Sequence, residues 1–229
     1  MTKKLFKLKI TSYFQRNGAY VVILVLVLAF LILSSEVHES LNGQKQIIST
    51  IDHSLANFFA DQRSPAFTEA AINITALGSK WVLSLIVFIS AMYLLFLKRY
   101  NDSLIFLITA IGAAVLNYYM KNFFEIPRPE IQSRLVEEHG YSYPSGHSQA
   151  SAAIYLALAF ILMKPLRNNK EKMLTLISFL LLIGLIGLSR IYLSVHFFSD
   201  VTAGIIAGFF WALTVQLFIK DKKFNSHQK

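Results

Sequence analysis

The sequence predicts an all-α protein, a polytopic membrane bundle of six transmembrane helices with one short interfacial amphipathic helix. The chain of 229 residues is 55% hydrophobic and has a mean hydropathy of +0.50, which is too apolar for an ordinary soluble domain. It also contains six uncharged apolar runs, each close to the about 20 residues that an α-helix needs to cross a bilayer. These runs cover residues 18–35, 81–97, 103–120, 148–163, 173–189 and 201–219. We therefore treat residues 1–229 as a single membrane-embedded domain.

The first apolar run follows a basic N-terminal segment, which a cleaved signal peptide would also show. However, no small-residue cleavage site follows the run, because Ser34-Ser35-Glu36-Val37 is a poor match. We expect residues 18–35 to be a retained membrane anchor.

Between the first two runs, apolar side chains recur at a spacing of three to four residues in the segment 46–61. They are Ile47, Ile48, Ile51, Leu55, Phe58 and Phe59, and the other face carries Gln46, Ser49, Asp52, His53 and Ser54. This pattern predicts an amphipathic helix, which either lies in the outer membrane interface or packs on the bundle as a lid. Ser64-Pro65 ends it, and the second span can extend back to about Phe67.

Glycines lie within the fifth and sixth runs. Small residues let membrane helices approach one another closely, so we expect a packing role for Gly184, Gly187, Gly204 and Gly208.

Six spans place both termini on the same side of the membrane, and cytoplasmic segments are enriched in Lys and Arg. With the termini inside, the inner segments carry Lys3, Lys4, Lys7, Lys9, Arg16, Lys98, Arg99, Lys164, Arg167, Lys170, Lys172, Lys220, Lys222, Lys223 and Lys229. The outer segments carry fewer, namely Lys45, Arg63, Lys80, Lys121, Arg128, Arg134 and Arg190. We expect a multi-pass protein of the cell membrane with both termini in the cytoplasm.

Three polar stretches lie next to the apolar runs: 121–129 (KNFFEIPRP), 143–147 (YPSGH) and 189–200 (SRIYLSVHFFSD). Ionisable side chains beside hydrocarbon are costly, so each is a candidate functional residue. The predicted topology places all three stretches on the extracytoplasmic face. We expect them to meet there in one site.

The second stretch directly precedes the fourth apolar run. Ser145 is a good N-cap candidate, and Gly146 lets the backbone approach a ligand closely. A helix N-terminus offers free N–H groups and a positive dipole end to an anion. The alternative is an ordinary cap at the start of a membrane helix.

The third stretch contains His196 and Asp200, which share a helix face at i, i+4 if the last helix starts near Leu193. A carboxylate on one ring nitrogen leaves the other free as a nucleophile or base. The alternative is a structural polar pair that closes a helix end.

Lys121, Arg128 and Arg190 bring three cations to the same surface. Phosphoryl transfer depends on positioning and on stabilising the charge of the phosphate oxygens, and arginine suits those oxygens well. The alternative for any one of them is a side chain that anchors to lipid headgroups.

Together these residues resemble the three-part signature of the type 2 phosphatidic-acid phosphatase superfamily, which also includes vanadium haloperoxidases. The parts are Lys121, six residues, then Arg128-Pro129; Pro144-Ser145-Gly146-His147; and Ser189-Arg190, five residues, His196, three residues, then Asp200. The resemblance implies that His196 would attack phosphorus to form a phosphohistidine and that Asp200 would orient it. His147 would protonate the leaving oxygen and then activate water. The phosphate would be held by Lys121, Arg128, Ser145, Gly146 and Arg190.

The resemblance implies that no metal or other cofactor is needed. The chain has no cysteine, and the outer acids Glu125, Glu130, Glu137 and Glu138 show no metal-ligand spacing. We interpret Glu137-Glu138-His139, the nearest approach to such a set, as a solvated loop turn.

These features predict an integral-membrane lipid phosphatase. The net charge of +9 does not indicate nucleic-acid binding, since no soluble basic face is evident. The resemblance implies a lipid phosphate or isoprenoid diphosphate as substrate, and the predicted outer-face site favours undecaprenyl diphosphate. Phosphatidylglycerophosphate, phosphatidic acid and a lipid A phosphate are alternatives. A transporter or a non-catalytic binding protein for a phosphate-bearing lipid or anion is the competing class, and the oligomeric state is open.

Overall fold

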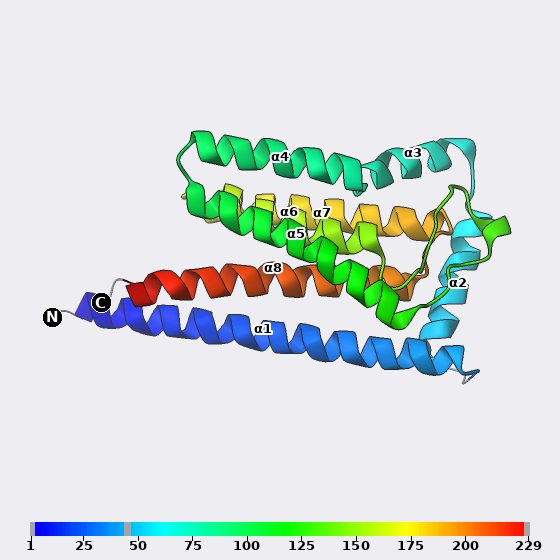
Figure 1. Cartoon of the computed structure of the whole chain (residues 1–229), viewed down its shortest axis with the longest axis horizontal. Coiled ribbons are helices and arrows are strands. Elements are labelled where there is room, and N and C mark those ends of the chain that lie inside the picture. The colour runs from blue at the N-terminus through cyan, green and yellow to red at the C-terminus, as the bar shows by residue number, and fades with distance from the viewer. Residues whose placement is uncertain (1–2, 44–46, 227–229) are drawn as a thin grey trace.

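A computed structural model describes residues 3–43 and 47–226, and within these residues the secondary structure is entirely helical (Figure 1). The helices are α1 (Lys3–Leu41), α2 (Ile47–Asp61), α3 (Pro65–Ala76), α4 (Lys80–Phe96), α5 (Tyr100–Phe124), a 3-10 turn η1 (Ile131–Ser133), α6 (Gly146–Met163), α7 (Asn169–Tyr192) and α8 (Phe198–Ser226).

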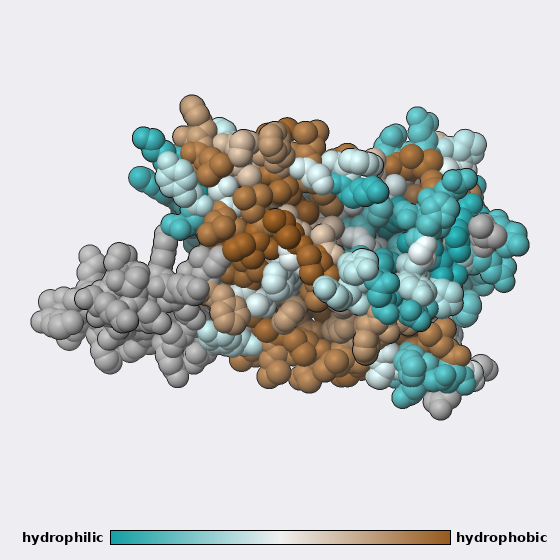
Figure 2. Space-filling model, viewed as in Figure 1, coloured by the Kyte–Doolittle hydropathy of each residue, from teal (hydrophilic) through white to brown (hydrophobic). Residues whose placement is uncertain are grey.

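The described residues contain up to six candidate membrane spans, in agreement with the six that the sequence predicts. Helices α1, α5, α6, α7 and α8 are each long and apolar enough to cross a membrane, and α3 and α4, which meet at a bend of 42°, make the sixth if they are counted as one span. The second span therefore begins at Pro65, where the Ser64 side chain caps the helix by accepting from Phe67 N–H. Figure 2 shows a hydrophobic band across the middle of the molecule and hydrophilic residues at the end where α2 lies.

Helix α6 lies at the centre of the bundle, in contact with α5, α7 and α8, while α1 packs on α8 and α4 on α5. The core around α6 includes Phe106, Tyr155, Ile183 and Ile186. The described ends of α1 and α8 that lead to the two termini lie together at one end of the bundle, and α2 lies at the other (Figure 1). The N-terminus of α6, the central helix, therefore lies among its neighbouring helices and points toward the end of the bundle where α2 lies.

Close helix packing depends on three of the four predicted glycines. A Cβ on Gly204 would lie 2.6 Å from Ser145 O, and one on Gly208 would lie 2.7 Å from the Cβ of Ala152, so α8 can approach α6 only without side chains there. Gly187 is similarly close to α8. The prediction is wrong for Gly184, because it lies on the outward face of α7 and no atom of the described residues lies within 4 Å of an added Cβ.

The predicted amphipathic helix is α2, which runs across the end of the bundle (Figure 1). It begins at Ile47, and Gln46 lies outside the described residues. Helix α2 contacts α1, α7 and α8, so it packs on the bundle. One residue of its polar face, Asp52, is buried.

Candidate active site

The three polar stretches all reach the end of the bundle where α2 lies (Figure 1). The first is the last turn of α5 with the loop beyond it, the second is the start of α6, and the third joins α7 to α8. Residues separated by up to about 80 positions in the chain are therefore neighbours in the fold, as expected when connections lie at one end of a helix bundle.

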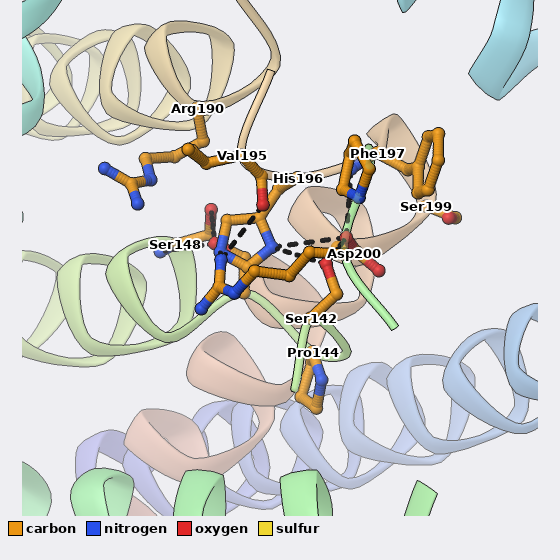
Figure 3. Close-up of polar contacts among 12 residues, drawn as sticks. Ser142, Pro144, Ser148, Arg190, Val195, His196, Phe197, Ser199 and Asp200 are labelled. Carbon is orange, nitrogen blue, oxygen red and sulfur yellow. Dashed lines mark hydrogen bonds and ion pairs between the residues drawn. The ribbon is translucent and has the colours of Figure 1, made fainter. Parts of the chain in front are cut away.

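The imidazole of His196 lies against a carboxylate and a hydroxyl (Figure 3). Its Nδ1 is 3.2 Å from Asp200 Oδ2 and 3.1 Å from Ser142 Oγ, and the Ser142 hydroxyl also donates to Asp200 Oδ2. All three residues are buried. They form a compact cluster that links the loop before α6 to the first turn of α8.

His196 and Asp200 do not meet on one helix face, because the condition for it, a last helix that starts near Leu193, is not met. Ser194 adopts a positive φ of 52° and α8 begins only at Phe198, so His196 lies in the connection before the helix. Asp200 reaches back from the first turn to accept Phe197 N–H at 2.9 Å, in the manner of the third helical residue of a capping box.

Arg128 determines which ring nitrogen of His196 carries the proton. Its Nη1 lies 3.0 Å from His196 Nε2, and a guanidinium can only donate, so Nε2 is the unprotonated acceptor. The proton then resides on Nδ1, facing Asp200 and Ser142. Burial lowers the pKa of His196 well below its usual value, and the charges of Arg128 and Arg190 lower it further. The ring is therefore neutral and has a lone pair on Nε2, which is the form that a nucleophile needs.

Lys121 and Arg128 hold the loop that leads into α6. Lys121 Nζ donates to the carbonyls of Tyr141 and Ser142, the latter at 2.9 Å. Arg128 donates through Nε and Nη2 to the carbonyls of residues 139–140 at 3.1–3.2 Å. The two cations thus fix the loop and are themselves fixed beside His196.

Arg190 is 1% exposed, and its guanidinium is held from two sides. Nη1 donates to Thr75 Oγ1 at 2.8 Å, and Nη2 forms an ion pair with Glu138 Oε1. The other oxygen of Glu138 lies 3.5 Å from Arg128 Nη2. Burial acts to raise the pKa of Glu138, but the charge of Arg190 lowers it overall, so Glu138 is an anion shared by two arginines.

The interpretation of residues 137–139 as a solvated turn is therefore wrong for Glu138. Its two neighbours are exposed as expected, whereas the Glu138 side chain is 24% exposed and faces the site. The sequence spacing did not reveal this contact because it depends on how the loop folds back over α7.

Ser145 and Gly146 form the start of α6. Ser145 is the N-cap and accepts from Ser148 N–H at 3.5 Å, while its own N–H donates to Asp200 O at 2.9 Å. A Cβ on Gly146 would lie 3.1 Å from Asn117 Oδ1. The α6 N-terminus is therefore joined directly to the first turn of α8.

His147 lies between Glu138 and the bend that separates α3 from α4. An added Cβ on Gly78 would lie 3.4 Å from His147 Cδ2, and His147 lies close enough to Glu138 for the two side chains to interact electrostatically. In the part of the chain that the structure describes, no hydrogen bond joins His147 to His196, whose ring nitrogens contact Arg128, Ser142 and Asp200 instead.

Three further residues position the site and were not found from the sequence: Ser142, Glu138 and Asn117. Asn117 donates to Gln149 Oε1 at 2.8 Å and to Pro144 O at 3.3 Å, which holds the start of α6 against α5. An amide within an apolar run was a usable signal, because polar side chains in spans bond to neighbouring helices. A loop serine such as Ser142 carries no comparable signal.

The cluster is suited to bind an anion. It combines two arginines and a lysine with a helix N-terminus, and these are the groups that hold phosphate oxygens. Among residues 3–43 and 47–226, no group of three or more His, Asp or Glu side chains is placed to hold a metal ion.

A bundle of up to six candidate spans with this histidine and cation cluster at one end is the arrangement expected of a membrane phosphatase. Residues 102–224, more than half of the chain, match the PAP2 superfamily. The chain belongs to that superfamily.

Named relatives align with most of the chain. Phosphatidylglycerophosphatase B of Bacillus subtilis (strain 168) is 34% identical over 186 residues, which cover 80% of this chain and 87% of the relative. The crystal structure of a transmembrane PAP2-type phosphatidylglycerolphosphate phosphatase from Bacillus subtilis has a TM-score of 0.79 and 30% identity, covering 87% of this chain and 96% of that one. The crystal structure of Aquifex aeolicus LpxE has a TM-score of 0.58 and 26% identity, covering 72% and 94%.

Proposed function

We propose that this protein hydrolyses a lipid phosphate or diphosphate without a metal, through a phosphohistidine at His196. The observation that carries the proposal is the placement of the buried His196 ring, with Nδ1 toward Asp200 and Nε2 toward Arg128. A nucleophilic imidazole needs its free nitrogen beside the groups that bind the phosphoryl oxygens. It also needs a carboxylate to stabilise the charge that the ring gains.

In the first step His196 Nε2 attacks phosphorus, and the bond between phosphorus and the leaving oxygen breaks. Asp200 stabilises the ring as it becomes positive, and His147 gives its proton to the leaving oxygen. In the second step His147 takes a proton from water, and the resulting hydroxide attacks the phosphohistidine. The N–P bond breaks, phosphate leaves and His196 returns to its neutral form.

The phosphate oxygens would be held by Lys121, Arg128 and Arg190, together with Ser145 and the N–H of Gly146. Preorganised positive groups of this kind stabilise the transition state of phosphoryl transfer. Because they already supply positive charge, we expect no requirement for a divalent metal. Arg128 Nη1 now contacts His196 Nε2, so it has to turn toward a phosphate oxygen as the substrate enters.

Two substrates have specific support. Phosphatidylglycerophosphate is favoured by the likeness to the Bacillus subtilis relative and to the Bacillus subtilis crystal structure, whose names carry that activity. Undecaprenyl diphosphate is favoured by the predicted position of the site on the extracytoplasmic face. Phosphatidic acid and a lipid A phosphate are the remaining candidates.

The site is proposed to face the outside of the cell, with both termini in the cytoplasm. The charge distribution of the loops supports this orientation, and the site lies at the end of the bundle opposite the ends of α1 and α8 that lead to the termini (Figure 1).

A phosphate-release panel over the four lipids tests the proposal. The assay uses detergent-solubilised protein with a chelator and no added metal, and it compares wild type with His196→Ala and with His139→Ala, an exposed histidine of the same end. We expect release by wild type and by His139→Ala, and at most a few per cent of it from His196→Ala. Release that requires a metal would refute the metal-independent mechanism, and a folded wild type that releases phosphate from none of the lipids would favour the binding or transport alternative.

A further inference from the structure

Helix α2 presents a buried carboxylate to the bundle although most of its surface is exposed. Asp52 is 8% exposed, whereas Ile47 and Phe58 on the same helix are largely exposed. A buried carboxylate is costly unless it is fully hydrogen-bonded. The hydrogen-bond partner of Asp52 therefore indicates the role of this buried side chain.

Both oxygens of Asp52 accept from one residue, Ser199. Oδ1 accepts the Ser199 N–H at 2.8 Å, and Oδ2 accepts the Ser199 hydroxyl at 2.7 Å. Ser199 is the second residue of α8, so its N–H is one of those that a helix start leaves without an intrahelical partner. Asp52 thus caps α8 from a different helix, with its negative charge at the positive end of the helix dipole.

This contact lies directly behind the proposed nucleophile. Ser199 precedes Asp200, and in Figure 3 the Ser199 side chain points away from the His196–Asp200 pair. The ring of His53, the neighbour of Asp52, packs edge-on against Phe197 with centroids 6.0 Å apart. The first turn of α8 is therefore held by Asp52 and His53 of α2 on one side and by its own residue Asp200 on the side of the proposed site.

The first turn of α8 needs both carboxylates. Asp200 accepts Phe197 N–H and Asp52 accepts Ser199 N–H. Without Asp52, a buried N–H and a buried hydroxyl would lose their partner, and the turn that carries Asp200 would be free to shift. Burial raises the pKa of Asp52 to about 6 although the Ser199 hydrogen bonds act to lower it, so the carboxylate is retained at this position against a desolvation cost.

We propose that Asp52 is a positioning residue: by capping α8 through Ser199 it fixes Asp200 and His196 for phosphoryl transfer, and so makes docking of α2 a condition of turnover. This inference rests on the proposed function. It gives the amphipathic helix a role in catalysis that does not depend on lipid entry.

The test compares Asp52→Ala, Asp52→Asn and Ser199→Ala with Asp61→Asn, which removes an exposed carboxylate from the end of the same helix. Each full-length variant is assayed with a lipid phosphate and with water-soluble p-nitrophenyl phosphate. Loss of charge-assisted hydrogen bonds predicts a kcat about 10- to 100-fold lower for Asp52→Ala on both substrates, with KM changed by less than about threefold. Asp61→Asn should retain wild-type kcat.

The conservative variant and a double mutant separate positioning from simple stabilisation. An asparagine can accept the Ser199 N–H and donate to its hydroxyl, so Asp52→Asn should recover most of kcat. Ser199→Ala should lower kcat several-fold, and adding it to Asp52→Ala should cause little further loss, since both act through one contact. If Asp52→Ala does not fold, the Asp52→Asn and Ser199→Ala results decide.

Three outcomes would overturn the proposal: wild-type kcat in Asp52→Ala or in Ser199→Ala, fully multiplicative losses in the double mutant, or a loss confined to the lipid substrate. The last result would assign α2 to lipid entry. A wild-type enzyme that releases no phosphate from either substrate would instead refute the proposed function itself.

Discussion

Replacing Ser142 by alanine removes a hydroxyl that donates to Asp200 Oδ2 and lies 3.1 Å from His196 Nδ1. Ser142 is fully buried, so water does not readily replace the lost donor. A hydrogen bond to a charged group contributes about 1.5–3 kcal/mol, and about 1.4 kcal/mol of transition-state stabilisation corresponds to a tenfold change in rate. We therefore expect Ser142→Ala to lower kcat by about 10- to 100-fold.

KM should change little in this variant, because the Ser142 hydroxyl faces the carboxylate and not the cations that would hold phosphate. Steady-state phosphate release measures both constants. Ser151→Ala is the matched control, since Ser151 is also a buried serine but its hydroxyl has no hydrogen-bond partner among the described residues. Wild-type kcat in Ser142→Ala, or an equal loss in Ser151→Ala, would refute the reasoning.

Further predictions follow from the same geometry. The lowered pKa of His196 means that the ring stays neutral as the pH falls through 6.5. The acid limb of the pH profile of kcat/KM should therefore lie below pH 6.5. A kcat/KM that has already fallen by half at pH 6.5 or above would contradict this. Glu138→Gln removes the anion that is paired with Arg190, and product phosphate should then inhibit about tenfold more strongly; unchanged or weaker inhibition would show that Glu138 does not compete with phosphate. Gly208→Ala should destabilise the bundle by about 1–3 kcal/mol through overpacking, as measured by thermal unfolding in detergent. Gly184→Ala should leave the stability unchanged, because position 184 has open space around it. Equal losses of stability in the two variants would contradict the packing assignment.

The spans could be predicted because the length and hydrophobicity of an apolar run determine whether it crosses a membrane. The site residues could be chosen because ionisable groups beside hydrocarbon are rare. The start of α8 could not be predicted, because it depends on the positive φ of Ser194. A serine gives no sequence signal for a positive φ, whereas a glycine would. His196 therefore lies in a loop and not on a helix face.

The remaining errors concern loops and helix faces whose partners are distant in sequence. The sequence predicts a solvated Glu138, because only the folded loop brings this side chain to Arg190, which is more than 50 positions away. The periodicity of α2 predicts that Asp52 lies on its polar face, but it does not distinguish a side chain in water from one with a buried polar partner. Its contact with Ser199 requires α2 to cross the end of the bundle, which local sequence does not specify.

The central claim is that His196 becomes covalently phosphorylated during turnover. Rapid quenching of wild-type protein with a phosphate-labelled lipid, followed by proteolysis and mass spectrometry under conditions that preserve phosphohistidine, measures this directly. The account predicts a transient phosphate on Nε2 of His196 that forms and decays at rates compatible with kcat. Label on another residue, or full turnover with no phosphorylated His196 at any time point, would contradict it.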